Sequence, residues 1–187
     1  MMHRILILAS GNGSLAQALI DAQELDIEIV AIISDQDDAH VLVRAQNAGI
    51  HTQVIKVGSS RENWNTEIIN AVVALNPDLV VSAGFMRILP PEFVNRFPTI
   101  NSHPALLPDF PGAHAVRDAL TAGVSVTGTT VHWVDDGVDT GPIITQMQVP
   151  VLPNDDEVTL HERIKKVERG LIVATIALIL PTLERNV

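Results

Sequence analysis

The sequence contains no cysteine, so neither a disulfide framework nor a zinc site built on thiolates can form. This absence fits a reducing compartment, and we expect a cytoplasmic protein. Aromatic residues are also scarce, at 3% of the chain, whereas 47% of its 187 residues are hydrophobic. Length and composition together predict one aliphatic-rich α/β domain, spanning residues 1–187, with a sizeable core.

Positive charge is in short supply as well. The chain has 12 Lys and Arg residues against 22 Asp and Glu residues, which gives a formal net charge of −10. Binding to nucleic acid needs clustered cations to face the phosphate backbone, so we expect no nucleic-acid partner. An anionic small substrate is still compatible with this charge if the few cations are concentrated at one site.

Long hydrophobic runs are also missing. The apolar run 171–180 is too short to span a bilayer and ends at Pro181, so it predicts a buried helix and no membrane partner. The apolar segment 4–9 lacks the length and the cleavage site of a signal peptide and leads directly into a glycine turn. No export is therefore expected.

Apolar runs alternate with helix-like segments through the first half of the chain. This alternation predicts a parallel sheet with right-handed crossovers. The later segments 125–134 and 143–149 are expected to add antiparallel strands. The predicted fold is a Rossmann-like open sheet, mostly parallel, with helices on both faces. Strands are expected at 5–9, 27–33, 52–57, 79–83 and 99–102, and helices at 15–22, 39–47, 91–97 and 115–122, with further helices opening at Arg61 and after a cap at Asp155 or Asp156.

A glycine turn, Ser10-Gly-Asn-Gly-Ser14, follows the first predicted strand and opens the first helix. Glycines there allow close backbone approach, and free amides at the start of a helix attract phosphate. A tight turn without a ligand is an equally good interpretation of the glycines alone. The pattern differs from G-x-G-x-x-G, so a dinucleotide is the weaker expectation.

Two breaker-rich loops, 101–112 and 135–142, carry the polar residues of most interest. Asn101 and His103 are two positions apart, so extended backbone places them on the same side. Asp139 lies just before the next strand. An amide, an imidazole and a carboxylate suit acyl-type transfer to an amine, with Asp139 holding His103 charged or relaying a proton. Taken singly, each is more often structural, and His132, within a predicted strand, is a rival for His103.

Five runs of the chain resemble the phosphoribosylglycinamide formyltransferase family. They recur in that family's order and spacing and cover nearly the whole chain. The resemblance implies transfer of a formyl group from 10-formyltetrahydrofolate to the amine of glycinamide ribonucleotide in purine biosynthesis. The runs are Ser10-Gly-Asn-Gly-Ser14, Ala83-Gly-Phe-Met-Arg-Ile-Leu89, Asn101-x-His-Pro-x-Leu-Leu-Pro108, Gly128-Thr-Thr-Val-His132 and Asp136-Gly-Val-Asp-Thr-Gly-Pro-Ile143.

The resemblance also implies roles for individual residues. A nucleotide-binding half, about 1–75, precedes a folate-binding and catalytic half, about 76–187. No metal is implied, and the protein is expected to be a monomer or homodimer. The implied catalytic residues are Asn101, His103 and Asp139, with His132 in support; the ribonucleotide residues are Gly11, Asn12, Gly13, Ser14, Leu15 and Glu168; the folate residues are Arg61, Met86, Arg87, Ile88 and Leu89, together with Asn101 and Asp139.

Local patterns alone allow plainer interpretations of several of these residues. Arg61 fits a solvated helix start, Ile88 fits core filling, and Lys165 with Glu168 fits an i,i+3 salt bridge. Lys165 and Arg169 are alternatively expected to assist phosphate binding. The chain departs from the common family pattern at Leu15, Ser102, Ala105 and Arg169.

Rival functions are a formyltetrahydrofolate hydrolase and a catalytically silent nucleotide-binding homologue. Hydrolases of this kind carry a regulatory domain ahead of the first strand, which makes them the weaker expectation. Methionyl-tRNA formyltransferase is less expected still, because it adds a nucleic-acid-binding domain and a basic surface.

Overall fold

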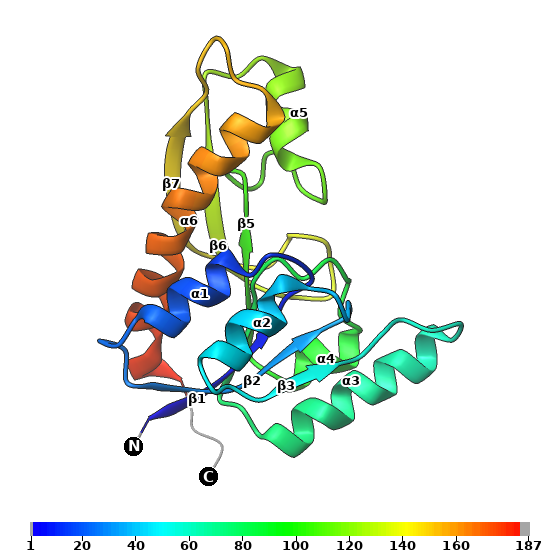
Figure 1. Ribbon diagram of the computed structural model, residues 1–187. Coiled ribbons are helices and arrows are strands. Elements are labelled where there is room, and N and C mark those ends of the chain that lie inside the picture. Colours follow the sequence, from blue (N-terminus) through cyan, green and yellow to red (C-terminus); the bar gives the residue numbers. More distant parts are fainter. Residues whose placement is uncertain (1, 184–187) are drawn as a thin grey trace.

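The computed structural model describes residues 2–183, in which one seven-stranded sheet forms the centre (Figure 1). The strands lie in the order β3-β2-β1-β4-β5-β6-β7. Their bounds are β1 (His3–Leu8), β2 (Ile27–Ser34), β3 (Thr52–Val54), β4 (Leu79–Ser82), β5 (Thr99–His103), β6 (Val126–Trp133) and β7 (Ile143–Pro150). The helices are α1 (Ser14–Asp21), α2 (His40–Asn47), α3 (Arg61–Leu75), α4 (Pro91–Arg96), α5 (Ala115–Ala122) and α6 (Glu157–Ile179), followed by a short 3₁₀ turn, η1 (Leu180–Thr182).

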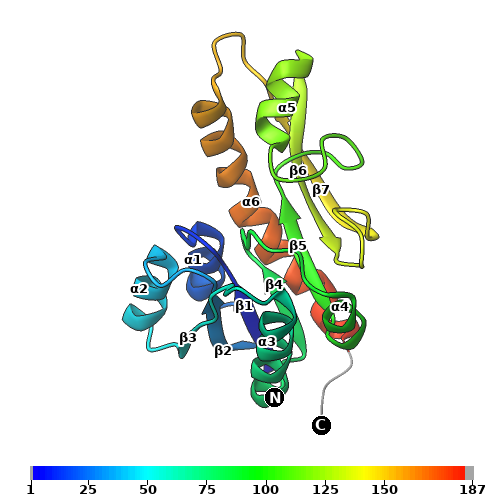
Figure 2. The ribbon, with the colours of Figure 1, turned by 90° about the vertical axis from the view of Figure 1, so that its right-hand side faces the viewer.

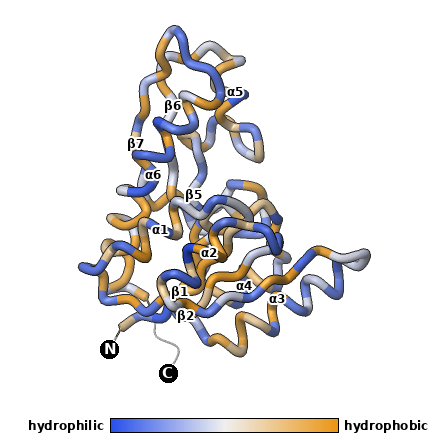
Figure 3. The backbone as a smooth tube through the Cα atoms, viewed as in Figure 1, coloured by the Kyte–Doolittle hydropathy of each residue, from blue (hydrophilic) through white to orange (hydrophobic). Residues whose placement is uncertain are grey.

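Helices cover both faces of the parallel part of the sheet. Alternate residues of β1 point to opposite faces, so Ile5 and Ile7 pack in one core cluster with residues of α1, α2 and α6. Leu6 and Leu8 pack in the other cluster, with residues of α3 and α4. Figure 3 shows the contrast between the apolar segments of this body and the hydrophilic start of α6. A strand buried on both faces explains why β1 is a continuous aliphatic run.

The chain leaves β1 in one direction along the sheet and later returns to continue in the other. Strands β2 and β3 are added on one side of β1, whereas β4 and β5 are added on its other side, all parallel. The connections after β1 and β4 therefore diverge at the carboxyl edge of the sheet, where open α/β sheets bind ligands. A hydrogen bond of 3.1 Å from Ser10 N to Gly84 O joins these two connections at their base.

The last strands extend the sheet in the antiparallel sense. β6 pairs with β5 and β7 pairs with β6, both antiparallel. In Figures 1 and 2 these strands project away from the parallel body, with α5 and the first half of α6 beside them. A separate small core of Val116, Val149, Leu160 and Ile164 holds α5, β7 and α6 together there. Helix α6 thus connects the two parts of the molecule.

The structure confirms the predicted fold class, with a mostly parallel sheet, an antiparallel addition and helices on both faces. It also confirms the buried helix, since Leu171, Ile172, Ile176 and Ile179 of α6 lie in the core. No helix in residues 2–183 is long and apolar enough to cross a membrane. The division into two halves stays a prediction, and residues 1 and 184–187 of the single predicted domain lie outside the described part.

One strand prediction was too long. A strand was expected over 52–57, but β3 covers only Thr52–Val54. It is an edge strand, and its pairing with β2 stops where β2 ends, at Ser34 opposite Val54. Beyond that point residues 56 and 57 have no neighbouring strand on which to continue the ladder.

The start of α6 is set by Asp156, whose side chain accepts a hydrogen bond of 2.8 Å from Thr159 N. The Thr159 hydroxyl in turn accepts from Asp156 N, at 2.9 Å, which completes a capping box. Asp155, the other expected cap, instead forms a two-point ion pair with Arg163.

We expect Asp156→Ala to lower the free energy of unfolding by about 1 kcal/mol, because the amide of Thr159 at the helix start loses its side-chain acceptor. Asp156→Asn is the matched control, since asparagine caps as well as aspartate and should cost much less. Urea denaturation of both variants measures the difference. Equal losses in the two variants would contradict the capping role.

Candidate active site

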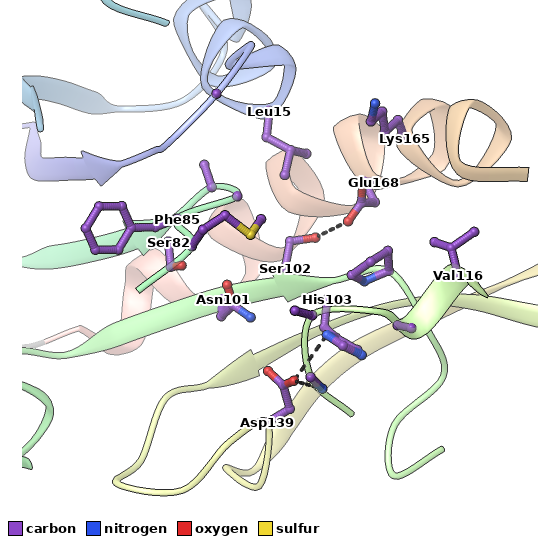
Figure 4. Close-up of a pocket in the computed structure, with 18 of the residues that line it drawn as sticks. Leu15, Ser82, Phe85, Asn101, Ser102, His103, Val116, Asp139, Lys165 and Glu168 are labelled. Atoms are coloured by element: carbon purple, nitrogen blue, oxygen red, sulfur yellow. Dashed lines mark hydrogen bonds and ion pairs between the residues drawn. The ribbon is translucent and has the colours of Figure 1, made fainter. Parts of the chain in front are cut away.

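A cavity of about 950 Å³ opens at the carboxyl edge of the sheet. Its walls come from the loops after β1 and β4, from β5, from the loop between β6 and β7, and from α6. Figure 4 shows Asn101, His103 and Asp139 gathered together, with Leu15, Lys165 and Glu168 on the opposite side and Phe85 beside them. Most of the residues implied by the family resemblance therefore meet in one place.

The glycine loop forms one wall of this cavity, and all five of its predicted residues, Gly11 to Leu15, line it. Gly13 precedes α1 with φ of 76°, a conformation that favours glycine. A Cβ atom at Gly13 would also overlap the side chain of Val41. Val41 N donates a hydrogen bond of 3.1 Å to Gly11 O, so the start of α2 holds the loop against α1.

Asn101 and His103 reach the cavity from β5, as their spacing predicted. Asp139 comes from the loop between β6 and β7, and its Oδ2 lies 3.3 Å from His103 Nδ1. The amide of Gly112 donates to the same oxygen at 2.8 Å. The loops 101–112 and 135–142, which are distant in sequence, are therefore joined at one carboxylate.

The surroundings of Asp139 and His103 set their protonation. Burial acts to raise the pKa of Asp139, but its contacts with His132, Gly112 and His103 outweigh burial and lower it. Burial also lowers the pKa of His103, against the opposing effects of Asp139 and the Phe110 carbonyl. Burial of the ring therefore works against a charged His103, and the expectation that Asp139 holds His103 charged or relays a proton stays a prediction.

The hydrogen bonds of His103 indicate which ring nitrogen carries its proton. Nε2 lies 2.8 Å from the Phe110 carbonyl oxygen, which can only accept. Nε2 is therefore the donor to that carbonyl, and Nδ1 faces the carboxylate oxygen of Asp139, which also accepts. Because an acceptor faces each ring nitrogen, the site can hold the ring with a proton on both, as uptake of a proton during a reaction requires.

His132 lies on β6 next to the other three polar side chains. Its Nε2 is 3.3 Å from Asn101 Nδ2 and 3.5 Å from Asp139 Oδ1. Its Nδ1 donates to the Trp133 carbonyl at 2.9 Å. The ring thus contacts two of the proposed catalytic side chains, which is the geometry that a supporting residue needs.

Glu168 lies in the cavity wall but is only 4% exposed. Its Oε1 accepts hydrogen bonds from Ser102 Oγ at 2.9 Å and from Thr129 Oγ1 at 3.5 Å. Burial raises the pKa of Glu168, and these hydroxyl contacts offset the effect only in part. The plainer interpretation of a Lys165–Glu168 salt bridge is wrong, because Lys165 pairs with Glu162 at 2.8 Å.

The loop 84–89 lines the cavity beside Asn101. Met86 and Ile88 are 66% and 62% exposed, whereas Leu89 is buried in the core. Core filling is therefore the wrong interpretation of Ile88. Arg61 is not among the residues that line the cavity, and its guanidinium instead binds the Ile88 carbonyl and lies over the Trp64 ring.

Comparison with known proteins agrees with this geometry. A sequence model of the formyl transferase family matches residues 3–176. A phosphoribosylglycinamide formyltransferase of Mycobacterium tuberculosis is 52% identical over 179 residues, which cover 93% of this chain and 83% of that protein. The Escherichia coli protein of the same name is 42% identical over 174 residues, or 89% of this chain and 82% of that protein.

A solved structure extends this agreement to the fold. Glycinamide ribonucleotide transformylase 1 from Symbiobacterium toebii superposes with a TM-score of 0.90 at 39% identity, covering 94% of this chain and 86% of that one. The chain belongs to the phosphoribosylglycinamide formyltransferase family. The resemblance drawn from the five sequence runs is thus confirmed.

Sequence reasoning missed Arg44 on α2, which lines the cavity beside the glycine loop. It donates to Asn12 O at 2.8 Å, to Asn12 Oδ1 at 2.9 Å and to Gln17 Oε1 at 3.2 Å. An arginine on a short amphipathic helix gives no local signal of this role. Only its position opposite the glycine turn reveals it.

Several cations line the cavity in spite of the negative net charge of the chain, among carboxylates that also line it. They include Arg44, Lys165 and Arg169, and His161 lies on the same helix, α6, as the last two. Burial and the nearby Lys165 lower the pKa of His161. Within residues 2–183, no group of three or more His, Asp or Glu side chains is arranged to hold a metal ion, and the absence of a metal stays a prediction.

The raised pKa of Glu168 predicts a pH-dependent stability. The folded protein holds this proton more tightly than the unfolded chain, so stability falls as pH rises above the ordinary value of 4.5. Glu168→Gln removes the ionisation but keeps an acceptor for Ser102. We expect the variant to gain stability relative to wild type as pH rises above 4.5, in urea denaturation at a series of pH values. Glu67→Gln, at an exposed position on α3, is the control, and a difference between the Glu168 variant and wild type that does not vary with pH would contradict the assignment.

Proposed function

We propose that this chain transfers a formyl group from 10-formyltetrahydrofolate to the amine of N1-(5-phosphoribosyl)glycinamide, in the purine pathway. The observation that carries the proposal is one cavity that joins the glycine loop at α1, the apolar loop 84–89 and the cluster of Asn101, His103 and Asp139. Relatives at up to 52% identity bear the name of this enzyme, and they do not favour the hydrolase or silent-homologue alternatives.

The proposed chemistry begins when the amine nitrogen attacks the formyl carbon. Negative charge develops on the formyl oxygen, and the Asn101 amide and the His103 ring are the donors proposed to stabilise it. The amine loses a proton to Asp139 through water or to His103. The carbon–nitrogen bond to tetrahydrofolate then breaks, and that nitrogen gains a proton. Holding the two substrates side by side supplies much of the acceleration.

The ribonucleotide is proposed to lie toward the glycine loop. Its phosphate would accept hydrogen bonds from the amides of Gly13, Ser14 and Leu15 at the start of α1, where the helix dipole also attracts an anion. Lys165, Arg169 and Arg44 supply positive charge nearby. Glu168, with Oε1 oriented by Ser102, is proposed to accept hydrogen bonds from the ribose hydroxyls.

The folate is proposed to lie along the loop 84–89. The exposed side chains of Met86 and Ile88 offer apolar contact to a flat ring, and main-chain groups from Met86 through Leu89 can bond its edge. Arg87 faces the same space. Arg61 is proposed to act through the Ile88 carbonyl that it binds. A cytoplasmic location, a monomer or homodimer, and the absence of nucleic-acid and membrane partners stay predictions.

A transfer assay that follows folate absorbance tests the proposal directly. Absorbance should change only when both substrates are present. Release of formate without ribonucleotide would indicate the hydrolase instead, and no turnover with intact folding would indicate a silent binding protein.

We expect His103→Ala and Asp139→Asn each to lower kcat by roughly 10²–10⁴-fold, because their interactions strengthen in the transition state. KM for the ribonucleotide should change little. Asp136→Asn, at an exposed position of the same loop, is the control and should keep full activity. Steady-state kinetics measures all three, and wild-type turnover in either site variant would remove that residue from the chemistry.

We expect Arg44→Met to raise KM for the ribonucleotide by roughly tenfold or more, because the glycine loop loses charged hydrogen bonds worth about 1.5–3 kcal/mol each. KM for the folate should stay within about twofold. Arg117→Met, an exposed arginine on α5, serves as the matched control. An equal rise in both KM values would show that Arg44 supports the fold in general and not the phosphate end.

A further inference from the structure

One buried carboxylate near the cavity has no part in the proposed chemistry. Asp35 directly follows β2 at the carboxyl edge of the sheet, and its side chain is 0% exposed. It does not line the cavity itself. A buried charge is costly unless it is paired, so its partners show what it does.

The main partner of Asp35 is Arg87, from the loop 84–89. Arg87 Nε lies 2.6 Å from Asp35 Oδ2, and Gln36 Nε2 donates to the same oxygen at 3.1 Å. Arg87 is 36% exposed and lines the cavity. The ion pair therefore connects a fully buried anchor to a cavity wall.

Ser10 links the same carboxylate to the neighbouring residue of the loop. Its Oγ accepts a hydrogen bond of 2.8 Å from Met86 N. The Ser10 hydroxyl is also close enough to Asp35 to help lower the pKa of that carboxyl, as Arg87 does. Asp35 Oδ1 is buried and forms no hydrogen bond with the described residues. The carboxylate of Asp35 thus lies beside Ser10, which holds Met86, and beside the side chain of Arg87.

Polar contacts, and not burial, determine the shape of the loop at residues 86–88. Met86 is held through its amide by Ser10, Arg87 through its side chain by Asp35, and Ile88 through its carbonyl by Arg61. The Met86 and Ile88 side chains remain mostly exposed, so they contribute little packing to hold the loop. Without its polar anchors, this wall of the cavity would have little to fix it.

We propose that Asp35 is a positioning residue for the binding of formyl-folate. Asp35 fixes Arg87 and, through Arg87, the conformation of the loop 84–89. This inference rests on the proposed function for the identity of the ligand. Asp35 acts through Arg87 and touches no substrate. Preorganisation of the loop lowers the ordering cost that the folate would otherwise meet on binding.

Asp35→Asn tests the proposal, because asparagine keeps the shape and an acceptor but removes the charge. In the ligand-free protein, amide hydrogen exchange in peptides covering 84–89 should rise at least tenfold, while exchange in β1 and α6 stays unchanged. In steady-state kinetics, KM for 10-formyltetrahydrofolate should rise roughly tenfold, while KM for the ribonucleotide changes less than about twofold. Asp37→Asn is the matched control, since Asp37 lies two residues away in an exposed ion pair with Lys56.

A second variant separates positioning from general damage to the fold. If Asp35 acts through Arg87, the double variant Asp35→Asn with Arg87→Gln should raise the folate KM and the exchange in 84–89 no more than the more affected single variant does. Unchanged exchange in 84–89, or faster exchange with an unchanged folate KM, would overturn the proposal. So would equal rises in both KM values. A wild-type protein that transfers no formyl group would refute the proposed function alone. The hydrogen-exchange measurement, with tetrahydrofolate added as the binding probe, would still decide whether Asp35 controls this loop.

Discussion

Parallel pairing of β1 with β4 is the constraint on which the rest of the site depends. It brings the carboxyl ends of β1, β2, β4 and β5 to one edge of the sheet while the chain continues in opposite directions on the two sides. The glycine loop and the loop 84–89 therefore leave the same edge and diverge. A formyltransferase needs two substrates to meet. The two loops form separate walls of one cavity, and β5 lies where these walls come together.

Three carboxylates at this edge, two buried and one partly buried, show how surroundings affect the pKa of a carboxyl group. Asp35 faces an arginine and Asp139 faces two histidines and an amide, and in both cases these contacts lower the pKa. Glu168 has mainly hydroxyl partners, so burial prevails and raises its pKa. The three thus suit different tasks, an anchor for a cation, a group that handles protons, and a buried acceptor for hydroxyl groups.

The antiparallel extension has a separate role in the same site. β6 carries His132 and Thr129, and the loop from β6 to β7 returns Asp139 to β5. Glu168 approaches from α6, which also packs against α1 of the parallel body. The predicted halves, about 1–75 and 76–187, therefore each contribute residues to both proposed sites, the one for the ribonucleotide and the one for the folate. Asp35 and Arg61 of the first half support the proposed folate wall, and Glu168 of the second half lies at the proposed ribonucleotide end.

Sequence alone was sufficient for features that depend on neighbours along the chain. Alternating apolar runs indicated the strands, Asp155 or Asp156 was expected at the start of α6, and the two-residue spacing placed Asn101 and His103 on one side of β5. The position of Asp139 in its loop suggested it as their carboxylate partner, and the family resemblance added Glu168, which no local pattern could connect to them. Only the tertiary structure revealed Arg44 on Asn12, Arg87 on Asp35 and Ser102 on Glu168, pairs that are 32, 52 and 66 residues apart. Such contacts depend on strand order and register, and therefore on how the whole chain packs and not on any one segment of it.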